Sequence, residues 1–129
     1  MLARILDRLG VQNPIVKLGD GHEAIRYLNG DGAYADRTKY PVPAVMFLDL
    51  KLPVVTGWEV LDWVHALSLK RDFLLFVYSE IRSVSDVRKV YALGADSYVA
   101  KPVKEIDIVN LLHHFPHPWQ FKPDYLPPA

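Results

Sequence analysis

The chain has 129 residues, and half of them are hydrophobic, which is enough for one domain with a sizeable core. Fifteen basic residues balance fifteen acidic ones, so no overall charge favours nucleic acid or an anionic membrane surface. The absence of cysteine excludes disulfides, thiolate metal sites and cysteine nucleophiles, and no stretch approaches the roughly 20 apolar residues of a membrane span. We therefore expect a cytoplasmic protein that binds neither nucleic acid nor membrane.

The first third of the chain predicts a helix, a strand and a second helix. Apolar residues recur at helical spacing over 2–9, and Gly10 then ends the pattern. The short run 15–18, Ile-Val-Lys-Leu, predicts a strand, and 24–28 has the spacing of an amphipathic helix. Residues 29–43 are rich in Gly, Asp and Pro, which is typical of a long loop that tolerates variation.

Further along the chain, apolar runs and helical patterns alternate. Strands are predicted at 44–49, 73–78 and 97–100, and helices at 60–67, 83–94 and 106–115. Such regular alternation indicates parallel strands, right-handed crossovers and helices on both faces of one sheet. The fold class that follows is a doubly wound α/β fold.

A polar side chain stands at or just after the end of each of these three strands. They are Asp49, Ser79 and Lys101. Because ligands of open parallel sheets bind beyond the carboxyl ends of the strands, we expect the three side chains to meet there. A carboxylate can attack phosphorus while a hydroxyl and an ammonium hold the phosphoryl oxygens, which favours a phosphorylation site. Taken singly, the three would be a turn cap, a strand end and a solvated lysine.

Three stretches resemble the motifs of one known family. Residues 47–57 (FLDLKLPVVTG) resemble the phosphoacceptor loop of bacterial response-regulator receivers, and 78–80 (YSE) and 98–102 (YVAKP) resemble their two later motifs. The likeness extends over nearly the whole chain to about residue 115. It implies a flavodoxin-like sheet and a role in two-component signal transduction.

The resemblance also implies a role for each motif residue. Asp49 would be the phosphoacceptor, and Ser79 and Lys101 would bind the phosphoryl group. Tyr98 matches the aromatic switch residue of the family, although an aromatic residue on a strand is often simply half-buried. Lys51 matches the position whose main-chain carbonyl is a ligand of Mg²⁺, and its side chain is either solvated or turned toward the mouth of the site.

The sequence departs from the family pattern at its beginning. Receivers usually start with an apolar strand that ends in an acidic pair, and this strand lies at the centre of the sheet. Without it, strands 15–18 and 44–49 lack the neighbour between them, and each buried unpaired backbone group costs about 1 to 3 kcal/mol. The sequence is then part of a longer one, or another chain supplies a strand, or the sheet rearranges.

The same departure bears on the metal. Mg²⁺ usually takes one or two carboxylates together with phosphate oxygens, and Asp49 is the one evident carboxylate at this site. Asp20 and Glu80 also lie at strand ends, but Asp20 fits a turn better and neither is a strong candidate. With the acidic pair missing, we expect weak binding of Mg²⁺ and poor phosphorylation of the chain as written.

The C-terminal residues form an extension to the domain. We assign 1–115 to the receiver domain and 116–129 to a tail rich in proline and aromatic residues, which is extended rather than helical. A similar tail occurs in receivers that resemble the phytochrome-associated regulators, where it helps dimerisation. Trp119, Phe121 and Tyr125 are therefore interface candidates for a homodimer, with strand exchange as one form of it; an arm folded on its own domain is equally consistent.

These observations favour a response-regulator receiver that takes a phosphoryl group from a sensor histidine kinase on Asp49 and signals to a downstream protein target. It would not be an enzyme. The alternative is a pseudo-receiver that acts as an interaction module without phosphorylation. A phosphatase of the haloacid dehalogenase type ranks last, because Lys51 stands where those enzymes place a second aspartate.

Overall fold

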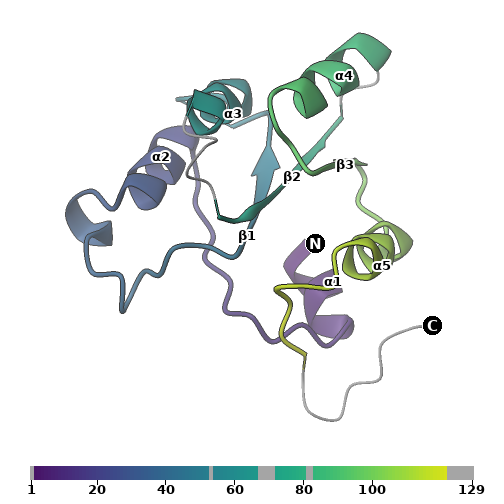
Figure 1. Cartoon of the computed structure of the whole chain (residues 1–129), viewed down its shortest axis with the longest axis horizontal. Coiled ribbons are helices and arrows are strands. Elements are labelled where there is room, and N and C mark those ends of the chain that lie inside the picture. The colour runs from purple at the N-terminus through teal and green to yellow at the C-terminus, as the bar shows by residue number, and fades with distance from the viewer. Residues whose placement is uncertain (1, 53, 67–71, 81–82, 122–129) are drawn as a thin grey trace.

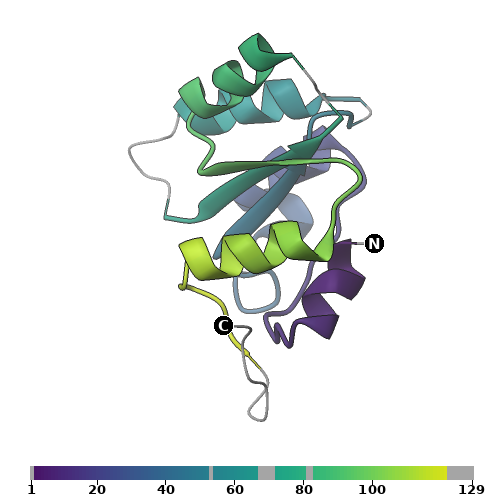
Figure 2. The same cartoon turned by 90° about the vertical axis from the view of Figure 1, so that its right-hand side faces the viewer.

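The computed structural model describes residues 2–52, 54–66, 72–80 and 83–121. Its helices and strands form three layers, with the sheet in the middle (Figures 1 and 2). In chain order they are α1 (Leu2–Arg8), α2 (Gly21–Asn29), the 3₁₀ helix η1 (Gly32–Tyr34), β1 (Val45–Asp49), α3 (Gly57–Ala66), β2 (Leu74–Ser79), α4 (Val84–Ala92), β3 (Ser97–Ala100) and α5 (Glu105–His114). No described helix has the length and apolar character that a membrane crossing needs.

The sheet is parallel and has the order β1-β2-β3, in register from Val45 opposite Leu74. Side chains alternate between its faces, as they do on any strand. Leu48 and Val77 pack with the helices α2, α3 and α4 in one apolar cluster. Phe76 packs with α1 and α5 in a second cluster on the other face. This arrangement confirms the doubly wound α/β class.

Two helices begin at the side chains that helix capping requires. Asp20 accepts the main-chain N–H of Glu23 at 2.8 Å at the start of α2, and Gly30 ends that helix with a positive φ of 71°. At the start of α4, the Ser83 side chain accepts the N–H of Asp86 at 3.4 Å. The caps fix where the helices start relative to the sheet edge.

The strand expected at 15–18 is absent. This stretch belongs to no ladder, and the side chains of Ile15 and Val16 are 50% and 49% exposed. A strand exists only through hydrogen bonds to a neighbour, and β1 pairs with β2 alone among the described residues. Figure 1 shows the stretch after α1 passing on the side of β1 away from β2. The prediction of a strand was wrong because its neighbour is not there.

The connection from α2 to β1 is more ordered than a variable loop. The Arg37 guanidinium donates to the carbonyls of Tyr27, Leu28 and Tyr40 at 2.8, 2.9 and 3.2 Å. The carbonyls of Tyr27 and Leu28 lie in the last turn of α2, where the regular helical hydrogen bonds end, and that of Tyr27 also accepts the Gly30 N–H at 3.2 Å. The rings of Tyr27, Tyr34 and Tyr40 also contact one another. These contacts hold the connection against α2, and the expectation that the loop tolerates variation stays a prediction.

Candidate functional site

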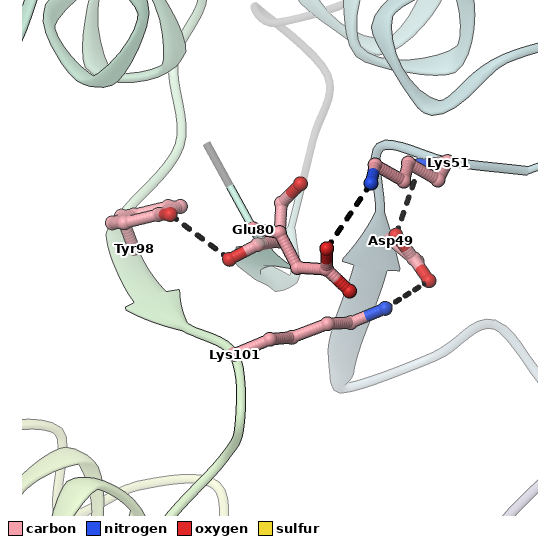
Figure 3. Close-up of polar contacts among 6 residues, drawn as sticks. Asp49, Lys51, Glu80, Tyr98 and Lys101 are labelled. Carbon is pink, nitrogen blue, oxygen red and sulfur yellow. Dashed lines mark hydrogen bonds and ion pairs between the residues drawn. The ribbon is translucent and has the colours of Figure 1, made fainter. Parts of the chain in front are cut away.

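Asp49, Ser79 and Lys101 meet at the edge of the sheet where the parallel strands end. Asp49 is the last residue of β1, Ser79 is the last of β2, and Lys101 directly follows β3. Figure 3 shows Lys101 reaching across from β3 to Asp49. The structure therefore brings together the three residues that the sequence placed at this edge.

The carboxylate of Asp49 is held from two sides. One oxygen, Oδ2, accepts a hydrogen bond from the Lys101 ammonium at 2.5 Å, and Oδ1 accepts the main-chain N–H of Lys51 at 2.9 Å (Figure 3). The Lys101 and Asp49 side chains are 25% and 20% exposed, so the ion pair is partly shielded from water. A Cβ at Gly57 would lie 2.2 Å from the Asp49 carbonyl oxygen, so only glycine fits beside this turn.

Ser79 contributes a buried hydroxyl. The residue is 1% exposed, and its Oγ makes no hydrogen bond to any described residue. A buried polar group without a partner costs about 1 to 3 kcal/mol. The hydroxyl is therefore available to bond a ligand or a water molecule. The main-chain carbonyl of Ser79, in contrast, accepts the N–H of Lys101 at 2.9 Å.

Lys51 and Glu80 form an ion pair at the mouth of the site. Their charged atoms are 3.2 Å apart, and the side chains are 66% and 55% exposed (Figure 3). An exposed pair of this kind adds little to stability, about 0 to 1 kcal/mol. The Lys51 side chain is thus both solvated and paired beside the site, and a role of this side chain in the chemistry stays a prediction.

Tyr98 lies on β3 with its hydroxyl turned toward the end of β2. The hydroxyl donates to the Ser79 carbonyl at 3.0 Å (Figure 3). The main-chain N–H of Tyr98 donates to the Tyr91 hydroxyl on α4 at 3.1 Å. The residue is half-buried, so its geometry suits a switch, and that role stays a prediction.

Tyr78, which precedes Ser79, lies in the field of the same charges. Burial raises the pKa of its hydroxyl above the ordinary value, the nearby Asp49 carboxylate raises that pKa further, and Lys101 lowers it. The Lys101 ammonium lies 5.0 Å from the centre of the Tyr78 ring. Tyr78 therefore stays neutral near pH 7, and it provides an aromatic wall for the lysine.

The donor set does not fit a Mg²⁺ site, although receiver domains generally bind Mg²⁺. Within the described residues, no group of three or more His, Cys, Asp or Glu side chains gathers to hold a metal. Both oxygens of Asp49 already accept hydrogen bonds, Asp20 caps α2, and Glu80 pairs with Lys51. Neither substitute carboxylate considered from the sequence therefore joins Asp49 in a metal site.

The first residues of the tail pack on their own domain. The Trp119 ring lies parallel to Phe76, with centroids 6.3 Å apart, and its indole N–H donates to the Phe115 carbonyl at 2.8 Å. Phe121 forms an antiparallel bridge with Val11. Tyr125 lies outside the described residues. The interface role of these three aromatic residues stays a prediction.

One contact of the site was missed from the sequence. Tyr91 lies inside the helix predicted at 83–94, and no role at the site was predicted for it from the sequence, yet its hydroxyl accepts the backbone N–H of Tyr98. Helical spacing does not reveal this bond, because it depends on how α4 lies against the edge of β3. The sequence hints at this bond only in that Tyr91, at a helical position, carries a hydroxyl that can form hydrogen bonds.

The fold and the site together define an α/β protein of the receiver type. Residues 1–113 match the family model described as response regulator receiver domain. The chain therefore belongs to the response-regulator receiver family, as its motifs indicated.

Individual relatives agree with this assignment. The probable methanogenesis regulatory protein FilR2 of Methanothrix harundinacea is 30% identical over 122 residues, which are 92% of this chain and 74% of that protein. Among solved structures, the bacteriophytochrome response regulator RtBRR has a TM-score of 0.80 at 33% identity, over 98% of this chain and 75% of its own. AtBRR, another bacteriophytochrome response regulator, has a TM-score of 0.77 at 32% identity, over 95% and 86%. The likeness to phytochrome-associated regulators is thus confirmed.

Proposed function

We propose that this receiver accepts a phosphoryl group on Asp49 from a sensor histidine kinase, and signals by a conformational change to a protein partner. The observation that carries the proposal is the arrangement at the sheet edge. The Asp49 carboxylate is ion-paired with Lys101, and the buried Ser79 hydroxyl at the next strand end has no hydrogen-bond partner among the described residues. Asp49 provides an anionic nucleophile, and Lys101 and Ser79 provide two groups that can bind phosphoryl oxygens.

In the proposed reaction, an Asp49 oxygen attacks the phosphorus of a phosphohistidine. The new O–P bond forms as the P–N bond breaks, and the imidazole leaves with the bonding electron pair and takes up a proton. Lys101 then exchanges part of its bond with Asp49 for a bond to a phosphoryl oxygen, and the Ser79 hydroxyl donates to another. The protein is the substrate of the kinase in this scheme and is not itself an enzyme.

In the proposed switch, the conformational change reaches the partner at the surface formed by α4, β3 and α5. Tyr98 connects this surface to Ser79 through its hydroxyl. A phosphoryl group that draws the Ser79 hydroxyl changes the setting of Tyr98, and the surface follows as a two-state element. We propose a cytoplasmic setting and a protein target, with a homodimer as one assembly that the aromatic tail would support.

The test is the intact mass of the protein after incubation with acetyl phosphate, with and without Mg²⁺, beside Asp49→Asn. We expect the wild-type chain alone to gain one phosphoryl group. Because the donor set lacks an acidic cluster, we expect slow phosphorylation and a weak response to Mg²⁺.

The outcomes separate two functions. No gain of mass by a folded wild-type chain, from acetyl phosphate or from a phosphorylated histidine kinase, would reject the phosphoryl switch. It would favour the second candidate, a pseudo-receiver that binds its partner without phosphorylation. The observation in favour of that candidate is the absence of a metal-binding group of carboxylates among the described residues.

A further inference from the structure

Tyr91 on α4 holds the backbone of the switch candidate. Its hydroxyl oxygen accepts the main-chain N–H of Tyr98 at 3.1 Å, although Tyr91 itself is 47% exposed. Among the described strands β3 is an edge strand, so this N–H has no neighbouring strand to bond. The Tyr91 hydroxyl therefore provides the acceptor that a further strand would otherwise offer.

From Tyr91, hydrogen bonds continue inward to the acceptor carboxylate. The Tyr98 hydroxyl donates to the Ser79 carbonyl at 3.0 Å, and the same carbonyl accepts the N–H of Lys101 at 2.9 Å. The Lys101 ammonium bonds Asp49 at 2.5 Å. Tyr98 is thus fixed at two points, its backbone by the helix and its phenol by the end of β2.

A second contact attaches α4 to the domain independently of the hydrogen bonds that lead from Tyr91 to Asp49. The Lys89 ammonium lies 4.9 Å from the centre of the Trp58 ring on α3. This cation–π contact ties α4 to a different neighbour from the one that Tyr91 bonds. Loss of the Tyr91 hydroxyl would therefore loosen the link between α4 and β3 and leave the helix attached to the domain.

We propose that Tyr91 is a positioning residue that transmits the state of Asp49 to the surface of α4. The proposal rests on the proposed function, in which Tyr98 is the switch. A change at Asp49 that moves Lys101 or Ser79 alters the setting of Tyr98, and hence its bond to Tyr91. Coupling of this kind is reciprocal, so a partner that engages the exposed Tyr91 ring changes the acceptor site in turn.

The first test removes one oxygen atom, by Tyr91→Phe, and observes the backbone amides by NMR. We expect the Tyr98 amide to exchange with solvent roughly fivefold faster, the effect of losing one net hydrogen bond. We also expect the Ser79 and Lys101 amide resonances to shift. Unchanged exchange at Tyr98 would overturn the proposal.

Tyr27→Phe is the matched control for this variant. The Tyr27 hydroxyl also makes one hydrogen bond to the backbone, to the Pro41 carbonyl at 2.8 Å, but lies on α2. We expect it to lower stability as much as Tyr91→Phe and to leave the Tyr98 amide unchanged. An equal effect of both variants at Tyr98 would mean a general loss of stability and would contradict a positioning role.

A second test measures loss of the phosphoryl group from Asp49 in Tyr91→Phe, Tyr98→Phe and the double variant. If Tyr91 acts through Tyr98, we expect the single variants to change the rate in the same direction, and the double variant to change it no more than the larger single. Independent, multiplicative effects on the rate would overturn the proposal.

A third test requires no phosphorylation, so it separates this proposal from the proposed function. Asp49→Asn removes the charge that Lys101 bonds, and we expect it to shift the ring resonances of Tyr91. The shift should vanish when Tyr98→Phe is also present. If the wild-type chain takes no phosphoryl group but this shift is found, the proposed function fails and the coupling stands. No shift at Tyr91 would reject the coupling itself.

Discussion

At the scale of single residues, one group at the site lowers the stability of the folded protein. The Ser79 hydroxyl is buried and makes no hydrogen bond to the described residues, whereas the Asp49 carboxylate, the Lys101 ammonium and the Tyr98 hydroxyl all have partners. Local stability is thus given up where a ligand is expected to bind.

Ser79→Ala tests whether the buried hydroxyl lowers the stability of the protein. We expect the free energy of unfolding to rise by about 1 kcal/mol, because the unsatisfied hydroxyl is removed and little volume is lost. Urea unfolding measures the change, and the lifetime of phosphorylated Asp49 should fall in the same variant. A clear loss of stability would mean that the hydroxyl is satisfied in the folded protein.

Gly57 is a residue at the site whose replacement should be damaging for geometric reasons. A Cβ there would lie 2.2 Å from the Asp49 carbonyl oxygen and 2.4 Å from the Leu50 Cα, so the backbone of the acceptor loop must shift. We expect Gly57→Ala to lower the free energy of unfolding by about 2 to 4 kcal/mol in urea titrations. Gly19→Ala is the control, since nothing lies within 4 Å of its added Cβ. Equal stabilities of the two variants would contradict the contact.

At the scale of secondary structure, the motif residues were the part that the sequence predicted well. Asp49 ends a strand because it stands at the end of a continuous apolar run, and Lys101 directly follows the shorter strand Ser97–Ala100. The run at 15–18 is also rich in β-branched and apolar residues, but among the described residues it has no neighbouring strand to pair with. The wrong prediction of a strand at 15–18 shows that strand formation depends on a neighbouring strand to pair with, as well as on the residues of the run.

Asp20 separates a capping role from a metal role. It accepts the Glu23 N–H at the start of α2, so we expect Asp20→Ala to lower the free energy of unfolding by about 1 kcal/mol. Mg²⁺ should not change the size of this effect. Asp62→Ala on the exposed side of α3 is the control and should be close to neutral. A loss of stability seen only when Mg²⁺ is present would instead assign Asp20 to a metal site.

At the scale of the whole molecule, the fold class and the meeting of Asp49, Ser79 and Lys101 followed from the alternation of strands and helices. Two features did not. The bond between Tyr91 and Tyr98 depends on the angle of α4 against the sheet, and the order of the 29–43 connection depends on Arg37 reaching back to α2. Both are contacts between segments that local sequence patterns treat separately.

The tail offers a test at this scale, because the Trp119 ring covers the Phe76 face of the core. We expect Trp119→Ala to lower the free energy of unfolding by about 2 kcal/mol, less than for a fully buried tryptophan because Trp119 is half-buried. Thermal unfolding at two protein concentrations measures it. A loss independent of concentration supports an arm folded on its own domain. A loss that shrinks on dilution supports a dimer interface, because the wild-type chain loses the stabilisation of its interface as the dimer dissociates.

The edge of β1 that pairs with no described strand affects how the protein behaves in concentrated solution. Among the described residues β1 bonds a strand on one side only, and the nearby chain exposes Ile15 and Val16. A bare edge beside apolar side chains is a template on which further chains add strand by strand. Concentrated solutions should therefore form cross-β aggregates with time, and lysine at position 15 or 16 should slow their growth with little effect on folding.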